Sequence, residues 1–393
     1  MVSIHSGARV TVPLNESLKP GARKKENDRM FISDRLLNIK PSGVRRIFDL
    51  ARQMKDPINL SIGEPDFDIP EPLKEEGIEW IKKGFNKYTP TQGIPELREK
   101  IGLHLKKKGV QFEDVMVTAG VTGGLLLASL ALINPGDEIV IPDPYFVMYE
   151  YQVLLMGGTP VFVNTYPDFR LREEEFVKKL SKRTKLMVIN SPNNPTGAVY
   201  PKEDLTMIAR LARERDLFIL SDDIYDNFVF DQPACPCLGK LYEKTITFGG
   251  FSKGWAMTGW RLGYVAGPRE IIQQMITLQQ YTFSSVSSFA QKAAVKALDY
   301  NVDHYIEQYK KKRDLIYEGL KNKYRVEKPG GAFYIFPEVP DGDGEAFVEK
   351  AIQKNLFVIP GSVFSKKNTH IRISFAASEE MILKGIEVLN RIG

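Results

Sequence analysis

Short apolar runs alternate with amphipathic helical patterns between about residues 70 and 300. Several of the runs are continuous stretches of Val, Ile and Leu, which is typical of strands covered on both faces. This alternation predicts an α/β fold in which a mostly parallel, seven-stranded sheet is flanked by helices. The predicted strands are Val115–Thr118, Glu138–Pro142, Pro160–Val163, Leu186–Asn190, Leu217–Ser221, Lys244–Phe248 and Leu262–Ala266.

The connections between these strands differ in their periodicity. Arg172–Leu180 and Lys202–Arg215 have the period of amphipathic helices. The gap between the last two strands has no helical period, so we expect these strands to pair antiparallel across a loop. That loop contains Lys253.

A second unit follows residue 300. A long amphipathic helix at Val302–Lys323 precedes three short apolar runs and a last helix from Ser378, which predicts a smaller α+β domain. We expect an N-terminal arm at residues 1–35, the small domain at residues 36–70 and 300–393, and the large domain at residues 71–299. The short strands are predicted near Ala332–Phe336, Leu356–Pro360 and His370–Phe375.

Composition excludes several classes of protein. A net charge of +5 on 393 residues is spread along the chain and does not indicate nucleic-acid binding. The longest apolar run, Leu125 to Ile133, is too short to cross a bilayer. Cys235 and Cys237 are too few for a disulfide framework, so a cytoplasmic protein is expected. The four histidines do not have metal-ligand spacing, and we expect no metal site.

The segment FGGFSKGWAMTGWRLGY contains Lys253 and, eight residues later, Arg261. A lysine amine loses its proton more easily when it is partly desolvated beside another cation, and it can then form a Schiff base with an aldehyde. A guanidinium is suited to a phosphate, and glycines allow close approach. The segment therefore indicates a nucleophilic lysine next to a phosphate site.

Three more polar segments follow predicted strands, at the edge of the sheet where α/β proteins bind ligands. AGVTGG (119–124) begins a helix whose backbone N–H groups can bind an anion. NSPNNPTG (190–197) is rich in amide donors, and SDDIY (221–225) contains Asp222, which needs a cationic partner if it is buried. With Lys253 and Arg261, this set of groups fits pyridoxal 5′-phosphate.

From about Leu36 to its end, the chain resembles the class I aminotransferases of the fold-type I pyridoxal-phosphate superfamily. Five segments carry the resemblance in the family's order, and all five together are specific. They are YTPTQGIPELR (88–98), NNPTG (193–197), SDDIY (221–225), the segment around Lys253, and HIRIS (370–374).

The resemblance implies a role for each residue of the site. Lys253, Asp222 and Tyr225 are the implied catalytic residues: Lys253 forms the Schiff base, Asp222 pairs with the pyridine nitrogen, and Tyr225 bonds the phenolate oxygen together with Asn194. Arg261 binds the phosphate. Tyr88 reaches the cofactor of the other subunit, which implies a homodimer. The other implied cofactor contacts are Gly120, Val121, Thr122 and the ring-stacking Phe146, for which Tyr145 is the alternative.

The implied reaction moves an amino group from an L-amino acid to a 2-oxo acid such as 2-oxoglutarate, with ping-pong kinetics. Arg372 holds the substrate α-carboxylate, with the backbone of Gly63 and the amide of Asn194 beside it. The amine of Lys253 removes the α-proton and returns it to the cofactor, a type of step that contributes ~10²–10⁴-fold.

Some positions depart from the family's pattern. Gly250 stands where many members have a phosphate-binding serine, and Thr122 replaces a lysine that reads a side-chain carboxylate in some aspartate enzymes. No arginine lies between Gln279 and Ser288. An aromatic, apolar or broad range of donors is therefore expected, for which Trp255, Tyr281 and Phe283 are candidate pocket residues.

Other functions remain open at the level of the sequence. An aspartate aminotransferase and a pyridoxal-phosphate-dependent carbon–sulfur β-lyase are the alternatives on the same cofactor. A transcription regulator would need a DNA-binding domain, which thirty N-terminal residues cannot form. A nucleotide-binding oxidoreductase is disfavoured because no strand is followed by Gly-x-Gly-x-x-Gly.

Overall fold

The computed structural model describes residues 33–393. The predicted N-terminal arm, residues 1–35, lies outside the described residues except for its last three positions, of which two belong to the short 3-10 helix η2 (Asp34–Leu36). No helix within residues 33–393 is long and apolar enough to cross a membrane.

The largest sheet has seven strands in the order β2-β8-β7-β6-β5-β3-β4. Neighbouring strands are parallel except at β8, which is antiparallel to both β2 and β7. The predicted fold class is confirmed, and the two strands on either side of the Lys253 loop pair antiparallel as expected. The strands are β2 (Asp114–Thr118), β3 (Glu138–Asp143), β4 (Thr159–Asn164), β5 (Thr184–Asn190), β6 (Phe218–Asp222), β7 (Thr245–Gly250) and β8 (Gly263–Gly267).

Helices cover both faces of this sheet. In β5, Leu186 and Val188 pack with residues of α5, α6 and α9, whereas Met187 and Ile189 pack on the opposite face with residues of α8. This two-sided burial follows from the alternation of side chains along a strand, and it explains the continuous apolar runs of the sequence. The helices are α2 (Gly43–Ala51), α3 (Glu71–Lys82), α4 (Pro95–Lys107), α5 (Gly120–Leu132), α6 (Met148–Leu155), α7 (Glu173–Val177), α8 (Lys202–Glu214), α9 (Arg269–Thr282), α10 (Ser288–Ala297), α11 (Asp303–Leu320), α12 (Gly344–Gln353) and α13 (Glu379–Ile392).

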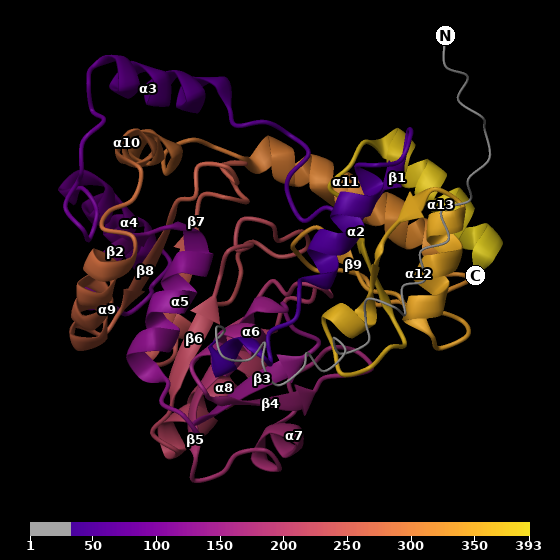
Figure 1. Cartoon of the computed structure of the whole chain (residues 1–393), viewed down its shortest axis with the longest axis horizontal. Coiled ribbons are helices and arrows are strands. Elements are labelled where there is room, and N and C mark those ends of the chain that lie inside the picture. The colour runs from indigo at the N-terminus through magenta and orange to yellow at the C-terminus, as the bar shows by residue number, and fades with distance from the viewer. Residues whose placement is uncertain (1–32) are drawn as a thin grey trace.

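The C-terminal part contains two smaller sheets. One has three antiparallel strands in the order β11-β12-β9, and the other pairs β1 in parallel with β10. Because the N-terminal segment supplies α2 and β1, β1 lies beside α13, and α2 lies beside β10 and β11 (Figure 1). The proposed domain boundaries themselves stay a prediction. The strands are β1 (Ile58–Asn59), β9 (Tyr334–Ile335), β10 (Leu356–Phe357), β11 (Ile359–Pro360) and β12 (Ile371–Ser374), with 3-10 helices η3 (Leu238–Lys240) and η4 (Gly361–Val363).

Local sequence signals set several element ends. Helix α13 begins after Ser378, as predicted, because the Ser378 hydroxyl accepts the N–H of Met381 at 3.2 Å. The predicted helix at Arg172–Leu180 is shorter than expected, since α7 spans only Glu173–Val177. The apolar run from Leu125 lies in α5, which is buried against the sheet.

Candidate active site

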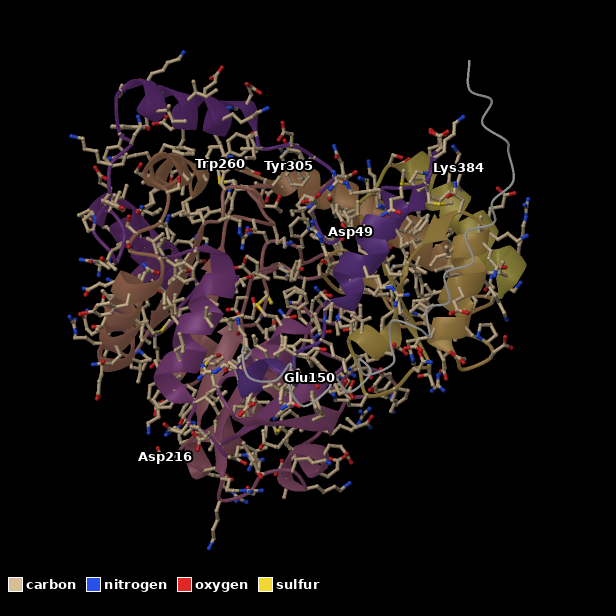
Figure 2. All side chains as sticks on the ribbon, viewed as in Figure 1. Asp49, Glu150, Asp216, Trp260, Tyr305 and Lys384 are labelled. Atoms are coloured by element: carbon tan, nitrogen blue, oxygen red, sulfur yellow. The ribbon has the colours of Figure 1, made fainter. Side chains whose placement is uncertain are left out.

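A cavity of about 460 Å³ lies beyond the carboxyl ends of β5 and β6 and the start of α5. Its wall combines segments that are far apart in the chain. Asp49 of α2 and Glu150 of α6, both labelled in Figure 2, mark two helices whose first turns line the cavity. The lining includes the predicted residues Gly63, Val121, Thr122, Phe146, Asn194, Asp222, Tyr225, Lys253, Arg261 and Arg372.

Lys253 lies in the loop between β7 and β8, and its half-buried amine donates to the carbonyl oxygen of Gly63 at 2.7 Å. Burial is the largest cause that lowers the pKa of Lys253 to about 8, and the charges of Arg261 and Arg372 act in the same direction. The carboxylate of Glu64 opposes this shift of the pKa. A substantial fraction of the amine is therefore neutral near physiological pH, as a nucleophile or proton acceptor requires.

Asp222 ends β6 and is almost completely buried. Its carboxylate accepts the hydroxyl of Tyr149 at 2.7 Å and the backbone N–H of Ile224 at 3.2 Å. Burial raises the pKa of Asp222 to about 6. The sequence predicted a cationic partner, yet among residues 33–393 no ion pair to this carboxylate is formed, and Lys253 exerts only a minor attraction. The carboxylate faces the cavity and can pair with a cationic ring nitrogen.

Tyr225 and Asn194 belong to one chain of hydrogen bonds. The hydroxyls of Tyr225 and Tyr334 lie 2.9 Å apart, and the side-chain amide of Asn194 donates to Tyr225 at 3.4 Å. Arg372 donates to the Asn194 side-chain oxygen at 3.2 Å. Burial is the largest cause that raises the pKa of Tyr225 well above its ordinary value, so the phenol stays protonated and can donate.

Arg372 on β12 is buried, and no carboxylate within residues 33–393 pairs with it. Its guanidinium donates to the carbonyl oxygen of Ser61 at 2.7 Å and stacks on the rings of Tyr334 and Phe364, each 4.6 Å away. Its Nε has no hydrogen-bond partner in the described chain. Burial lowers the pKa of Arg372 from its ordinary value. An unpaired buried cation at a cavity wall is a site for an anion.

The phosphate site predicted around Arg261 is assembled from two turns. Gly120 at the start of α5 has φ +69, and a Cβ there would lie 2.7 Å from a terminal nitrogen of Arg261. Gly263 brings β8 so close to α5 that a Cβ would lie 2.7 Å from the carbonyl carbon of Gly120. The exposed guanidinium of Arg261 therefore lies against the helix N-terminus, next to Val121 and Thr122. This is an anion-binding arrangement.

The structure distinguishes between the two candidate ring-stacking residues. Phe146 lines the cavity, whereas the hydroxyl of Tyr145 donates to Glu150 at 2.5 Å and its ring stacks on Phe162. Tyr145 is therefore the wrong choice, because its side chain is engaged by Glu150 and Phe162 and does not line the cavity. Adjacent residues of a sharp turn differ in this way, and their order in the sequence does not show which one faces inward.

Three residues proposed for an apolar substrate pocket do not line the cavity of the described chain. The indole N–H of Trp255 donates to the carbonyl of Tyr300 at 3.4 Å, and Tyr281 is 85% exposed. Phe283 lies against Gly123 of α5. Tyr88 is also outside the cavity, and its side chain is 90% exposed. Other apolar lining residues, missed from the sequence, are Val44, Phe48 and Ile62.

Sequence reasoning also missed Tyr149 and Tyr334, which bond Asp222 and Tyr225. Neither stands in a polar motif: Tyr149 is in the first turn of a largely apolar helix and Tyr334 is in a short apolar strand. A lone tyrosine in an apolar run is a weak signal, and only the contact with a buried polar group identifies its role.

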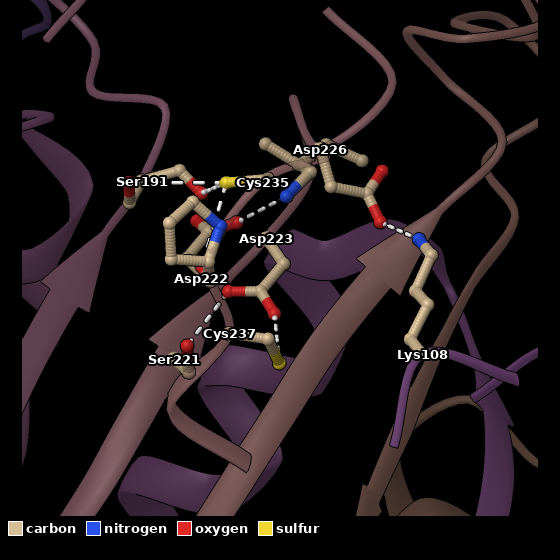
Figure 3. A network of polar contacts seen from close by, with 10 residues as sticks. Lys108, Ser191, Ser221, Asp222, Asp223, Asp226, Cys235 and Cys237 are labelled. Carbon is tan, nitrogen blue, oxygen red and sulfur yellow. Dashed lines mark hydrogen bonds and ion pairs between the residues drawn. The ribbon is translucent and has the colours of Figure 1, made fainter. Parts of the chain in front are cut away.

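A second polar network lies directly behind Asp222 (Figure 3). The hydroxyl of Ser221 donates to Asp223 at 2.6 Å, and the thiol of Cys237 lies 3.5 Å from the same carboxylate. Burial raises the pKa of Asp223 to about 7. Nearby, Asp226 forms an ion pair with Lys108. The network fixes the turn after β6 and so positions Asp222.

Comparison with known proteins agrees with this site. The chain matches the family model "Aminotransferase class I and II" over residues 55–389. It is 40% identical to an aspartate aminotransferase of Pyrococcus abyssi and 39% identical to aromatic-amino-acid aminotransferase 2 of Thermococcus litoralis, in each case over 92% of this chain and 98% of the relative. The solved structure of aspartate aminotransferase from Thermus thermophilus with maleate has a TM-score of 0.88 at 36% identity, covering 92% of this chain and 99% of that one.

The chain therefore belongs to the class I and II aminotransferases. It is an amino-acid aminotransferase that depends on pyridoxal phosphate and has the fold-type I architecture, as its sequence motifs indicated. The cavity fits that cofactor: it offers an amine of lowered pKa, a buried carboxylate that forms no ion pair with any described residue, and a guanidinium against a helix N-terminus.

Proposed function

We propose that this enzyme transfers the amino group of an aromatic, apolar or broad range of L-amino acids to a 2-oxo acid such as 2-oxoglutarate. One observation carries the proposal. The amine of Lys253 lines the same cavity as two buried side chains, Asp222 and Arg372, and no carboxylate within residues 33–393 pairs with Arg372. An amino-acid substrate needs the Lys253 amine to accept its α-proton and the Arg372 guanidinium to bind its α-carboxylate.

The proposed catalytic residues are Lys253, Asp222 and Tyr225. Pyridoxal phosphate supplies an aldehyde and an electron-withdrawing ring when it is bound. With the cofactor bound, the carboxylate of Asp222 would hold a proton on the ring nitrogen, and the Tyr225 hydroxyl and Asn194 amide would donate to the ring oxygen. The amine of Lys253 accepts the substrate α-proton, for which a pKa of about 8 is well matched.

The remaining groups orient cofactor and substrate. Arg261 and the backbone of Gly120, Val121 and Thr122 bind the phosphate, and Phe146 covers the ring. Arg372 binds the substrate α-carboxylate bidentately, supported by Asn194 and the backbone at Gly63. The backbone carbonyl oxygen of Ser61 and the side-chain oxygen of Asn194 already hold this guanidinium in place. Arg372 therefore needs little reorganisation to bind the carboxylate.

A homodimer is part of the proposal. Tyr88 is outside its own cavity and is 90% exposed, which supports a role at the cofactor phosphate of a second subunit. We place the enzyme in a reducing compartment such as the cytoplasm, because Cys235 and Cys237 are free thiols.

Replacement of Lys253 tests the catalytic assignment. Lys253→Ala is expected to lower turnover at least ~10²–10⁴-fold because the proton acceptor is lost. Borohydride reduction of the wild-type holoenzyme, followed by peptide mass spectrometry, should find the cofactor attached to Lys253. The exposed Lys384→Ala on α13 is the control and should retain activity. Attachment to another lysine would contradict the assignment.

The donor range is tested by following the half-reaction of the holoenzyme spectroscopically with each amino acid in turn. The apolar lining by Val44, Phe48 and Ile62 supports aromatic and apolar donors. Conversion by aspartate alone would favour the aspartate aminotransferase alternative. Release of thiol or sulfide from cystathionine or cysteine would favour the β-lyase alternative.

A further inference from the structure

The cavity contains one arginine to which the proposed function gives no role. Of the charged lining residues, Lys253, Asp222, Arg261 and Arg372 already have one. Arg45 on the first turn of α2 is left, together with Glu64, whose carboxylate accepts the hydroxyl of Thr258 at 3.3 Å.

Arg45 is held only weakly. Its Nε lies 3.4 Å from the carboxylate of Asp49, with 69% and 51% of the two side chains exposed. Such exposed i,i+4 pairs contribute only about 0.3–0.5 kcal/mol. The guanidinium also lies 5.3 Å from the centre of the Phe48 ring. The side chain can therefore exchange these partners for a ligand at small cost.

The reaction itself creates a need for such a residue. In ping-pong transfer, one cavity must accept two substrates in turn, here an apolar or aromatic amino acid and a dicarboxylic 2-oxo acid. Val44 and Phe48 offer an apolar surface on α2, and Arg45 offers a positive charge on the same turn of the helix. The side chain at position 122, threonine, carries no charge for this purpose.

We propose that Arg45 binds the far carboxylate of dicarboxylic substrates such as 2-oxoglutarate and glutamate. Apolar side chains use the Phe48 and Val44 surface instead, and Arg45 then stays over the Phe48 ring and beside Asp49. The inference rests on the proposed function, because Arg372 must hold the α-carboxylate for the far end of the substrate to point at a second cation. It makes Arg45 a specificity-determining residue, not a catalytic one.

Steady-state kinetics of the holoenzyme with two acceptors test this inference. For Arg45→Gln, kcat/KM with 2-oxoglutarate should fall about tenfold, which corresponds to about 1.4 kcal/mol, mainly through KM. With phenylpyruvate as the acceptor, kcat/KM should change less than about twofold, because that substrate has no far carboxylate. Arg45→Lys should recover part of the loss.

Arg52→Gln is the matched control. Arg52 directly follows the last residue of α2, is exposed, and also lies over the Phe48 ring, at 5.6 Å, but it does not line the cavity. The substitution removes the same charge, so it reports any general electrostatic effect. Arg52→Gln should leave kcat/KM unchanged with both acceptors.

The outcomes separate this inference from the proposed function. Equal losses with both acceptors, or no loss in Arg45→Gln, would overturn the role of Arg45 while the enzyme still transaminates. An Arg52→Gln variant with the same selective loss would also overturn it. Failure of the wild-type enzyme to use any 2-oxo acid would instead reject the proposed function.

Discussion

Ionisable side chains of the cavity are buried at a cost in stability. Asp222 keeps a carboxylate in an apolar environment with one phenol and one backbone N–H as donors, and Arg372 keeps a guanidinium there with no carboxylate partner in the described part of the chain. Each group raises the free energy of the empty enzyme. Each is also ready for a ligand of opposite charge, so the cost is recovered on binding.

Asp222→Asn should therefore stabilise the apoenzyme at high pH. The pKa of Asp222 is about 6 in the folded protein against 3.8 as its ordinary value, so folding disfavours the charged form. The free energy of unfolding of the wild type therefore falls relative to that of the variant as the pH rises from about 4 to about 6. Above about pH 6 the difference between the two proteins stays constant. At pH 8 the free energy of unfolding of the variant should exceed that of the wild type by up to about 3 kcal/mol, and at pH 3 by almost nothing.

Thermal unfolding of the two apoenzymes at several pH values measures this difference. The exposed Asp216→Asn is the control, since its carboxylate pairs with Lys244 at the surface. A variant that is less stable than the wild type at pH 8 would show that the Asp222 carboxylate stabilises the fold, contrary to the argument.

At the scale of elements, the phosphate site depends on how closely β8 approaches the start of α5. The Cβ of any residue at position 263 would lie 2.7 Å from the carbonyl carbon of Gly120 and 2.8 Å from the backbone nitrogen of Val121. Backbone atoms cannot give way as a flexible side chain can. The glycine is required by the contact between two elements and not by its own φ.

Gly263→Ala should therefore push the two elements apart and weaken cofactor binding. We expect the Kd for pyridoxal phosphate to rise at least about tenfold, since the helix N–H groups and Arg261 then no longer share one phosphate. Gly259→Ala in the loop just before β8 is the control, because a Cβ there meets nothing within 4 Å. Fluorescence titration of folded apoenzymes gives both constants; equal values would refute the close-approach argument.

At the scale of the whole molecule, two exposed side chains support the proposed homodimer. Tyr88 and Tyr281 are 90% and 85% exposed although both are large and partly apolar. Side chains of this kind are typical of interfaces. If Tyr88 completes the site of the partner, one chain alone has an incomplete phosphate site, and activity depends on assembly.

Subunit complementation tests this arrangement. Tyr88→Phe should weaken cofactor binding, and Lys253→Ala should be inactive. In an equimolar, re-associated mixture, half of the dimers are mixed, and each has one site with both native residues. About a quarter of all sites should then be native, so the activity of the mixture exceeds the average of the two parents. A mixture no more active than the average of its parents would place Tyr88 at its own site.

Much of the fold and the site could be predicted because their signals are local. Apolar runs of four or five residues indicated the sheet strands, and polar turns at their ends indicated Asn194, Asp222 and Lys253. Strand ends converge at one edge of a sheet, so residues more than a hundred positions apart could be expected to meet. The missed residues, Tyr149 and Tyr334, stand in apolar segments without such signals.

The sequence by itself determined the class of fold, the order of the motifs and the chemistry of the site, because periodicity and turn residues act over a few positions. Only the tertiary structure decided which side chains enter the cavity. Phe146 faces it while Tyr145 turns away, and α2 brings Arg45 and Phe48 to its wall. These outcomes depend on how distant elements pack, and packing is a property of the whole chain.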